Sequence, residues 1–246
     1  MTKKREATVY LIPVPLGDTA FSRVLPDYHR EVVESLRYFI VENIRTARRF
    51  LKRMNPAIEI DKLHFKAMDK YIVPAEIAKM LVPLSEGESI GVMSEAGCPA
   101  VADPGAMVVA FAHRNGYRVE PLVGPSSILL ALMSSGLNGQ HFTFHGYLPV
   151  EAAKRADRLK VLEARMIAEN ETQIFIETPY RNNKLLEDII RVCNPMTWLC
   201  IASNITCEGE QVKTRRVKEW KLDALDLHKI PTIFILGNEA IERLLI

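Results

Sequence analysis

Two short segments of the chain combine glycine, proline and small polar residues in a way that suits ligand binding. The first, Ser94–Gly105, holds two prolines and two glycines, and the second is Gly124-Pro125-Ser126-Ser127. Glycine lets the backbone approach a ligand closely, and serine hydroxyls and the free amides of a helix start offer directional hydrogen-bond donors. These residue types predict a site for a small polar ligand. The alternative for either segment alone is that glycine and proline simply shape a tight turn.

The residues around these segments predict the elements that hold them. The short apolar run 89–93 suits a buried strand of a parallel sheet, and the apolar spacing of residues 106–113 predicts a helix. A second strand over 117–123 and a second helix over 128–135 repeat this order. Ligands of open parallel sheets bind beyond the carboxyl ends of the strands, so both segments are expected to line one site.

A third segment of the same kind lies near the start of the chain. Pro13-Val14-Pro15-Leu16-Gly17-Asp18 follows the β-rich run Thr8–Ile12 directly. It is therefore expected to join the same site.

The length of the chain and the recurrence of the strand and helix pattern predict two domains. With 246 residues the chain can build two cores, and strands and helices alternate again in its second half. We predict an N-terminal α/β domain over residues 1–123 and a C-terminal α/β domain over residues 124–246, with a ligand cleft between them. The sequence has no G-x-G-x-x-G motif, which argues against a Rossmann fold.

Composition excludes several classes of protein. The formal net charge of +2 is too small by itself to indicate nucleic-acid binding. The four cysteines and six histidines show no metal-ligand spacing, so we expect reduced thiols and no metal. No signal peptide and no apolar run long enough to cross a bilayer are evident, which predicts a cytoplasmic protein without membrane contact.

The strongest cluster of basic residues follows the strand-like run 38–41. Glu42-Asn43-Ile44-Arg45 leads into a helix that carries Arg45, Arg48, Arg49, Lys52 and Arg53. One interpretation is a solvated helix face, which is the common role of such a run. The other is contact with a phosphate backbone.

Taken in order along the chain, four motifs resemble the tetrapyrrole methylase superfamily. They are Pro13-Val14-Pro15-Leu16-Gly17, the segment Ser94–Gly105, Val123-Gly124-Pro125-Ser126-Ser127 and Tyr147-Leu148-Pro149. Within this superfamily they are most similar to the bacterial enzymes that methylate a cytidine ribose 2′-hydroxyl in the decoding region of small-subunit ribosomal RNA. The motifs recur in the same order over nearly the whole chain.

The resemblance implies a two-lobed α/β methyltransferase that binds S-adenosylmethionine between its lobes, acts on small-subunit ribosomal RNA and forms a homodimer. It also implies which positions contact the cofactor. In the first half these are Leu16, Ala96, Gly97, Cys98, Val101, Ser126 and Ser127. In the second half they are Glu177, Ile205, Pro231 and Thr232.

Two segments depart from the pattern of the ribosomal RNA group. Members of that group usually carry Glu-Asp-Thr-Arg where this chain has Glu42-Asn43-Ile44-Arg45. They usually carry Arg-Glu-Leu-Thr-Lys where this chain has Ser203-Asn204-Ile205-Thr206-Cys207, which lacks one carboxylate and two cations.

Methyl transfer to a ribose hydroxyl needs in-line positioning and a group that takes up the hydroxyl proton. Glu42, Asp103 and Glu177 are the carboxylates placed near the expected site, and Arg45 can hold a phosphate. Glu42, Arg45 and Asp103 are therefore the candidate catalytic residues. Each also has a structural alternative, such as a Glu42–Arg45 pair or a helix cap at Asp103. A methyltransferase for a tetrapyrrole or another small molecule and a non-catalytic cofactor-binding protein remain as alternative functions.

Overall fold

The computed structural model describes residues 6–69 and 71–238, and the chain divides into two compact units, Met1–Ser126 and Ser127–Ile246. Each unit is built around a five-stranded sheet of its own. The chain therefore has the two α/β units that its alternating pattern predicts. The division falls after Ser126, whereas the sequence pattern places it between residues 123 and 124.

The sheet of the first unit is parallel throughout. Its strand order is β3-β2-β4-β1-β5, and each neighbouring pair runs in the same direction. The strands are β1 (Thr8–Leu11), β2 (Tyr38–Val41), β3 (His64–Ala67), β4 (Ile90–Met93) and β5 (Arg118–Pro121). Since all five carboxyl ends meet at one edge, the loops that follow them are neighbours.

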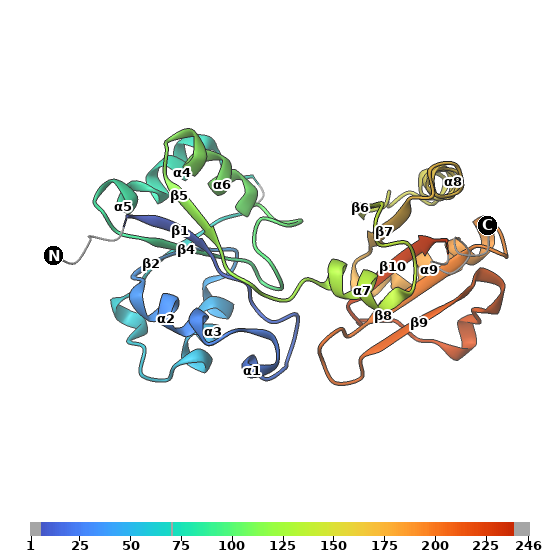
Figure 1. Ribbon diagram of the computed structural model, residues 1–246, viewed down its shortest axis with the longest axis horizontal. Helices are drawn as coiled ribbons and strands as arrows, with labels where there is room; N and C mark the ends of the chain where they lie inside the picture. The colour runs from blue at the N-terminus through green and yellow to red at the C-terminus, as the bar shows by residue number, and fades with distance from the viewer. Residues whose placement is uncertain (1–5, 70, 239–246) are drawn as a thin grey trace. The chain divides into compact units, whose positions relative to one another are not determined.

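Helices cover both faces of this sheet (Figure 1). One core packs the strands against α2 (Tyr28–Ser35) and α3 (Ile44–Met54), with the short α1 (Phe21–Val24) beside them. The core on the other face packs the strands against α4 (Pro74–Met80), α5 (Val82–Ser85) and α6 (Gly105–Arg114). Buried strands with helices on both sides explain the continuous apolar runs in the sequence.

Two expected elements differ from the structure. The sequence predicts a single helix over residues 75–84, but the structure divides it into α4 and α5 at Leu81, because Pro83 has no N–H for a continuing helix. The sequence also predicts a short strand over residues 61–65, but β3 starts later, because Ile60–Lys62 forms the 3₁₀ turn η1.

The sheet of the second unit is mixed, in the order β6-β7-β10-β8-β9. Strands β6 (Phe142–Tyr147) and β7 (Thr172–Ile176) are parallel, while β10 (Thr232–Gly237) lies antiparallel between β7 and β8 (Trp198–Ser203). Strand β9 (Gln211–Arg216) forms the far edge, antiparallel to β8. The carboxyl ends of β7 and β8 therefore lie beside the amino end of β10.

Two long helices and a buried ion pair stabilise this unit. Helices α8 (Ala152–Glu169) and α9 (Asn182–Val192) pack on one face of the sheet, and α7 (Ser127–Ser135) contacts β8, β9 and β10. Arg155 of α8 donates to Asp188 of α9 at 2.5 and 2.8 Å and to the Pro149 and Val150 carbonyls. The remaining short elements are the 3₁₀ turns η2 (Pro179–Arg181), η3 (Val217–Glu219) and η4 (Leu222–Ala224).

None of the helices in the described part of the chain combines the length and the apolar character that crossing a bilayer requires.

Candidate functional site

The three loops singled out by the sequence lie together at the carboxyl edge of the first sheet. Outside the regular strands, Val14 and Gly97 exchange two backbone hydrogen bonds of 3.0 and 3.1 Å, which join the loop after β1 to the loop after β4. The Cys98 thiol lies 3.4 Å from the Pro125 carbonyl oxygen and so connects the second loop to the one after β5. The expected meeting of these loops is confirmed.

Two glycines permit this close approach. Gly97 has φ of +73°, a conformation that L side chains rarely adopt, and an added Cβ there would lie 3.2 Å from Leu16 Cδ2. At Gly124 an added Cβ would lie 2.2 Å from Pro13 Cβ, which no side chain can accommodate. The glycines therefore fix the contact between loops, as expected for backbone that approaches another group closely.

Glu42 joins these loops from the end of β2. Its Oε2 accepts a 2.8 Å hydrogen bond from the Glu95 backbone N–H, so the carboxylate is held against the loop after β4. No ion pair with Arg45 forms within residues 6–69 and 71–238. Burial raises the pKa of Glu42, the Glu95 N–H opposes that rise, and the negative charge of Asp103 adds to it.

Asp103 shapes the same loop and keeps one oxygen available. Its Oδ1 accepts hydrogen bonds from Ala100 N (2.9 Å) and Gly105 N (2.6 Å), which ties the loop to the start of α6. Its Oδ2 is buried and finds no hydrogen-bond partner in the described structure. Burial raises the pKa of Asp103, and the two backbone donors oppose the rise. A buried, unsatisfied carboxylate oxygen is uncommon in proteins.

The start of α3 shows how the chain tolerates its departure at residues 43 and 44. The Asn43 side chain accepts hydrogen bonds from the Arg45 and Thr46 N–H groups and so caps the helix, as aspartate also can. Ile44 packs against the core beneath the helix. These two positions are structural, while Glu42 and Arg45 stay at the sheet edge.

Some of the basic side chains of α3 already form ion pairs within the protein, and others do not. Arg53 donates to Asp18 and to the Thr19 carbonyl, and Arg48 forms an exposed ion pair with Asp61. Arg45 and Arg49, one helical turn apart, are exposed and form no ion pair among the described residues. They are the cations most available to an anionic partner.

The cofactor contacts expected in the second half also gather at one edge of their sheet. Thr232 pairs with Ser203 and Ile233 with Ile176, while Asn204 N donates to the Pro231 carbonyl at 3.0 Å. Consequently Glu177, Ile205 and the Pro231-Thr232 pair come from adjoining chain segments. The Glu177 carboxylate is only 2% exposed and pairs with Arg181 at 2.6 Å.

Strained backbone is concentrated in these same loops. Six described non-glycine residues have positive φ, and five of them lie at the two sheet edges: Ala100, Ala102, Asn204, Thr206 and Lys229. The sixth, Asn170, ends α8. Such strain occurs preferentially at functional sites. Thr206 Oγ1 is, like Asp103 Oδ2, buried without a partner in the described structure.

The remaining expected cofactor positions are distributed between the units. Ala96 and Val101 are exposed in the loop after β4, and Ser126 is the last residue of the first unit. Ser127 begins α7 of the second unit. Sequence reasoning did not single out Lys229, since lysine is not a residue type that usually adopts a positive φ.

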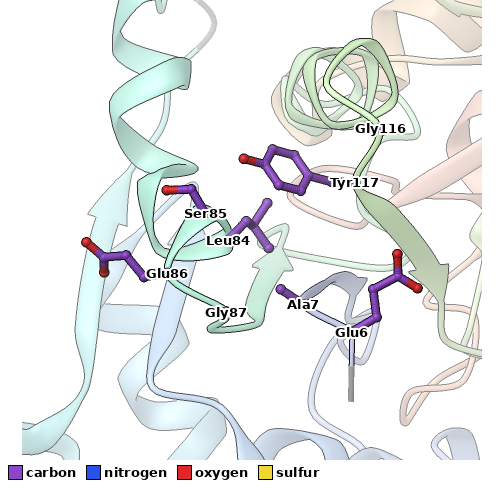
Figure 2. Close-up of a pocket in the computed structure, with 8 residues that line it drawn as sticks. All are labelled: Glu6, Ala7, Leu84, Ser85, Glu86, Gly87, Gly116 and Tyr117. Carbon is purple, nitrogen blue, oxygen red and sulfur yellow. The ribbon is translucent and has the colours of Figure 1, made fainter. Parts of the chain in front are cut away.

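A cavity of the first unit lies at the other edge of its sheet. It has a volume of about 450 Å³ and is lined by residues that precede β1, β4 and β5 (Figure 2): Glu6, Ala7, Leu84, Ser85, Glu86, Gly87, Gly116 and Tyr117. Ligands of parallel sheets bind at carboxyl ends, so this cavity is separate from the loops described above.

A second cluster, in the other unit, has the side-chain types of a metal site. Ligand atoms of His141, Glu169 and Glu171 lie within 4.8 Å of one another. Arg165 pairs with Glu171 at 3.0 Å and with Glu169 at 3.6 Å. The positive charge of the Arg165 guanidinium therefore already balances part of the negative charge that a metal ion would need from these carboxylates.

Comparison with known proteins agrees with this fold and these loops. The family model for Tetrapyrrole (Corrin/Porphyrin) Methylases matches residues 8–221. Among solved structures, the methyltransferase CobJ has a TM-score of 0.62 at 15% identity, covering 95% of this chain and 94% of that one. The uroporphyrin-III-C-methyltransferase from Thermus thermophilus has a TM-score of 0.56 at 18% identity, with the same coverage. These two likenesses show the fold.

Closer relatives are found by sequence. A protein of Escherichia coli O157:H7 named Ribosomal RNA small subunit methyltransferase I is 30% identical over 87% of this chain and 71% of its own length. The protein of that name from Vibrio cholerae is also 30% identical, over 83% of this chain and 67% of its own length.

The fold, the loops and these matches define a methyltransferase with two α/β units. The chain belongs to the tetrapyrrole methylase family. Membership implies S-adenosylmethionine as the methyl donor.

We predict that Glu42→Gln stabilises the folded chain at neutral pH. Because the folded-state pKa of Glu42 is raised, its contribution to stability is fully present below the unfolded pKa of about 4.3 and is lost as pH rises through the folded pKa. Glutamine keeps an acceptor for the Glu95 N–H without the partly buried charge. Urea denaturation should therefore show a more stable variant near neutral pH, and the difference should vanish in acid.

The matched control is Glu86→Gln, which neutralises an exposed carboxylate at the opposite edge of the sheet and should leave the pH dependence unchanged. A wild-type chain more stable than Glu42→Gln at neutral pH would contradict the assignment of an unfavourable, partly buried charge to Glu42.

Proposed function

We propose that the chain transfers a methyl group from S-adenosylmethionine to a ribose 2′-hydroxyl of small-subunit ribosomal RNA. The observation that carries the proposal is the position of Glu42, a carboxylate of raised pKa held against the loop after β4 at the foot of a basic helix. A proton acceptor beside exposed cations suits a hydroxyl that is flanked by phosphates. Relatives 30% identical over most of the chain are named Ribosomal RNA small subunit methyltransferase I, which supports the class of substrate.

The residues present fit the methyl donor in each unit. In the first unit Leu16, Ala96, Gly97, Cys98, Val101 and Ser126 contribute to its binding, with Asp103 Oδ2 as a buried acceptor that still lacks a donor. In the second unit Ser127, Glu177, Ile205, Pro231 and Thr232 contribute, with Thr206 Oγ1 as a further unsatisfied group. Strained loops with unpaired polar atoms are preorganised for a polar ligand.

Three side chains carry the reaction. When bound, S-adenosylmethionine supplies an electrophilic methyl carbon, and its sulfur leaves with the electron pair of the broken carbon–sulfur bond. Glu42 accepts the proton of the 2′-hydroxyl as the new oxygen–carbon bond forms. Arg45 holds an adjacent phosphate, and Asp103 keeps the loop before α6 in place through Ala100 and Gly105. The raised pKa of Glu42 makes it a better base than an exposed glutamate.

The remaining parts of the proposal follow from the substrate class and the family. A ribosomal RNA substrate places the enzyme in the cytoplasm, with the small ribosomal subunit as its partner. The family resemblance supports a homodimer. No metal takes part in the proposed chemistry.

The direct test is transfer of labelled methyl from S-adenosylmethionine to small ribosomal subunits from a strain that lacks this gene, followed by mapping of the product. Label on one ribose 2′-oxygen is expected. Label on a base, or transfer only to a tetrapyrrole or another free small molecule, would overturn the proposal. Cofactor binding with no turnover on any of these would indicate a non-catalytic protein.

We predict that Gly97→Ala weakens S-adenosylmethionine binding by about tenfold or more, which corresponds to ~1.4 kcal/mol. Alanine at a φ of +73° costs ~1–2 kcal/mol of stability, and its Cβ presses on Leu16. Gly116→Ala is the matched control, because Gly116 has φ of +72° with nothing within 4 Å. Both variants should lose stability from the positive φ, and Gly97→Ala should lose more because of its contact with Leu16. Calorimetry on the folded proteins should show weaker cofactor binding only for Gly97→Ala. Equal affinities in the two variants would exclude Gly97 from the cofactor site.

We predict that Arg49→Gln weakens binding to small ribosomal subunits and reduces the slope of log affinity against log salt by about 0.7 to 1, as expected for one lost phosphate contact. Arg48→Gln is the control on the same helix. Because Arg48 is already paired with Asp61, the effect on the salt slope should be smaller. An unchanged slope in Arg49→Gln would show that this face of α3 is merely solvated.

A further inference from the structure

We propose that Tyr180 is a stacking platform for an unpaired nucleobase of the RNA substrate, with Lys229 beside it to hold the neighbouring phosphate. This assignment rests on the proposed function and names a substrate subsite that none of the site residues above includes. Three observations support it: the Tyr180 ring is exposed, the turn that carries the ring is held by hydrogen bonds and an ion pair, and a cation lies next to the ring.

Tyr180 is unusually exposed for an aromatic residue that is so firmly anchored. The residue is 69% exposed and lies in η2, directly after the carboxyl end of β7. Exposed apolar surface is common on proteins and by itself says little. The surroundings of Tyr180, however, are built to hold the ring in place.

A partly buried ion pair fixes the short turn that carries the ring. Arg181 donates to the Glu177 carboxylate at 2.6 Å and to the Thr178 hydroxyl at 3.1 Å. The Glu177 carboxylate is 2% exposed, so this pair is shielded from solvent on the acidic side. Tyr180 lies between the two partners in sequence, and its backbone has little freedom to move.

A second segment supports the turn from the other side. Lys229 N donates to the Pro179 carbonyl at 3.0 Å, and Asn182 Nδ2 donates to the Ile230 carbonyl at 2.6 Å. Asn183 Oδ1 accepts from Leu227 N at 2.8 Å, and the Leu227 side chain is buried. Lys229 itself is held at φ of +61°, a conformation that is strained for a lysine.

These contacts place a cation and a second ring next to Tyr180. The Lys229 Nζ lies 5.8 Å from the Tyr180 ring centroid, within the range of a cation–π contact. The exposed His228 ring meets the Tyr180 ring edge-on, with centroids 5.7 Å apart and planes at 76°. An aromatic face bordered by a cation is the arrangement that binds single-stranded RNA, in which bases stack on rings and phosphates meet cations.

The location links the ring to the part of the second unit that is proposed to contact the methyl donor. Tyr180 follows Glu177 by three residues, and Lys229 precedes the Pro231-Thr232 pair by two. Both belong to the sheet edge that is proposed to contact the methyl donor. A tyrosine loses little conformational entropy on binding, since only two side-chain torsions must be fixed. A rigid ring there can hold an unpaired base of the RNA substrate.

The test compares Tyr180→Leu with Tyr180→Phe in the full-length chain. Phe142→Leu is the control, since Phe142 is an exposed ring at the opposite end of the same sheet. Three quantities are measured: quenching of 2-aminopurine in a short single-stranded oligoribonucleotide, KM and kcat with small ribosomal subunits, and S-adenosylmethionine affinity by calorimetry.

For Tyr180→Leu we expect loss of quenching and a rise in KM of between about 5-fold and 150-fold, the range for one base stacked on an aromatic ring. Cofactor affinity should stay unchanged. Tyr180→Phe and Phe142→Leu should both resemble the wild type, because the first retains a ring and the second leaves the platform intact. Lys229→Gln should lower the salt slope of oligonucleotide binding by about 0.7.

Several results would overturn the assignment. One is an unchanged KM together with unchanged quenching in Tyr180→Leu. Another is an equal loss of quenching in Tyr180→Phe and Tyr180→Leu. A third is a loss of cofactor affinity in Tyr180→Leu, which would show that the ring contacts the adenine of the methyl donor. If the wild type methylates subunits and Tyr180→Leu does so equally well, the proposed function stands and the platform fails. If the wild type quenches the probe through Tyr180 yet methylates no subunit, the platform stands and the proposed function fails.

Discussion

The candidate site of the first unit depends on one pair of backbone hydrogen bonds, those exchanged by Val14 and Gly97. Loops that follow neighbouring strands are close in space but are not thereby ordered, and fixing each residue costs about 1–2 kcal/mol of conformational entropy. The reciprocal bonds join the first two loops as a sheet would. The Cys98–Pro125 contact and the close approach of Gly124 to Pro13 then add the third loop.

Much of this arrangement can be predicted from the sequence, because glycine and proline mark the ends of strands directly. The parallel strands β1, β4 and β5 and the loops after them follow from short apolar runs and turn residues. The order of the strands in the sheet cannot be predicted in this way. Strand β10 lies between β7 and β8, and local sequence patterns do not show which strands pair. The break at Leu81 and the late start of β3 likewise depend on Pro83 and on a 3₁₀ turn that periodicity overlooks.

The chemistry of the site is only partly readable from residue types. The sequence can nominate Glu42 and Asp103 as carboxylates near the site, but the Glu42–Glu95 hydrogen bond joins residues far apart in the chain. The positive φ angles of Ala100, Ala102 and Lys229 leave no signal either, because these are not the residue types that usually adopt them. Tertiary contacts impose that strain, so it becomes visible only in the folded chain.

The structure also separates the residues of the Glu42–Arg45 segment by role. Asn43 caps α3 with its side-chain oxygen, a task that aspartate performs equally well, and Ile44 adds to the core beneath the helix. Asn43 and Ile44, the two residues that differ from the pattern of the ribosomal RNA group, therefore have structural roles in the helix cap and the core. Glu42 and Arg45, which the chain shares with that group, are the two that face the loops and solvent. A carboxylate whose charge is disfavoured by burial, beside a cation without an ion-pair partner in the described structure, supports the roles proposed for Glu42 and Arg45.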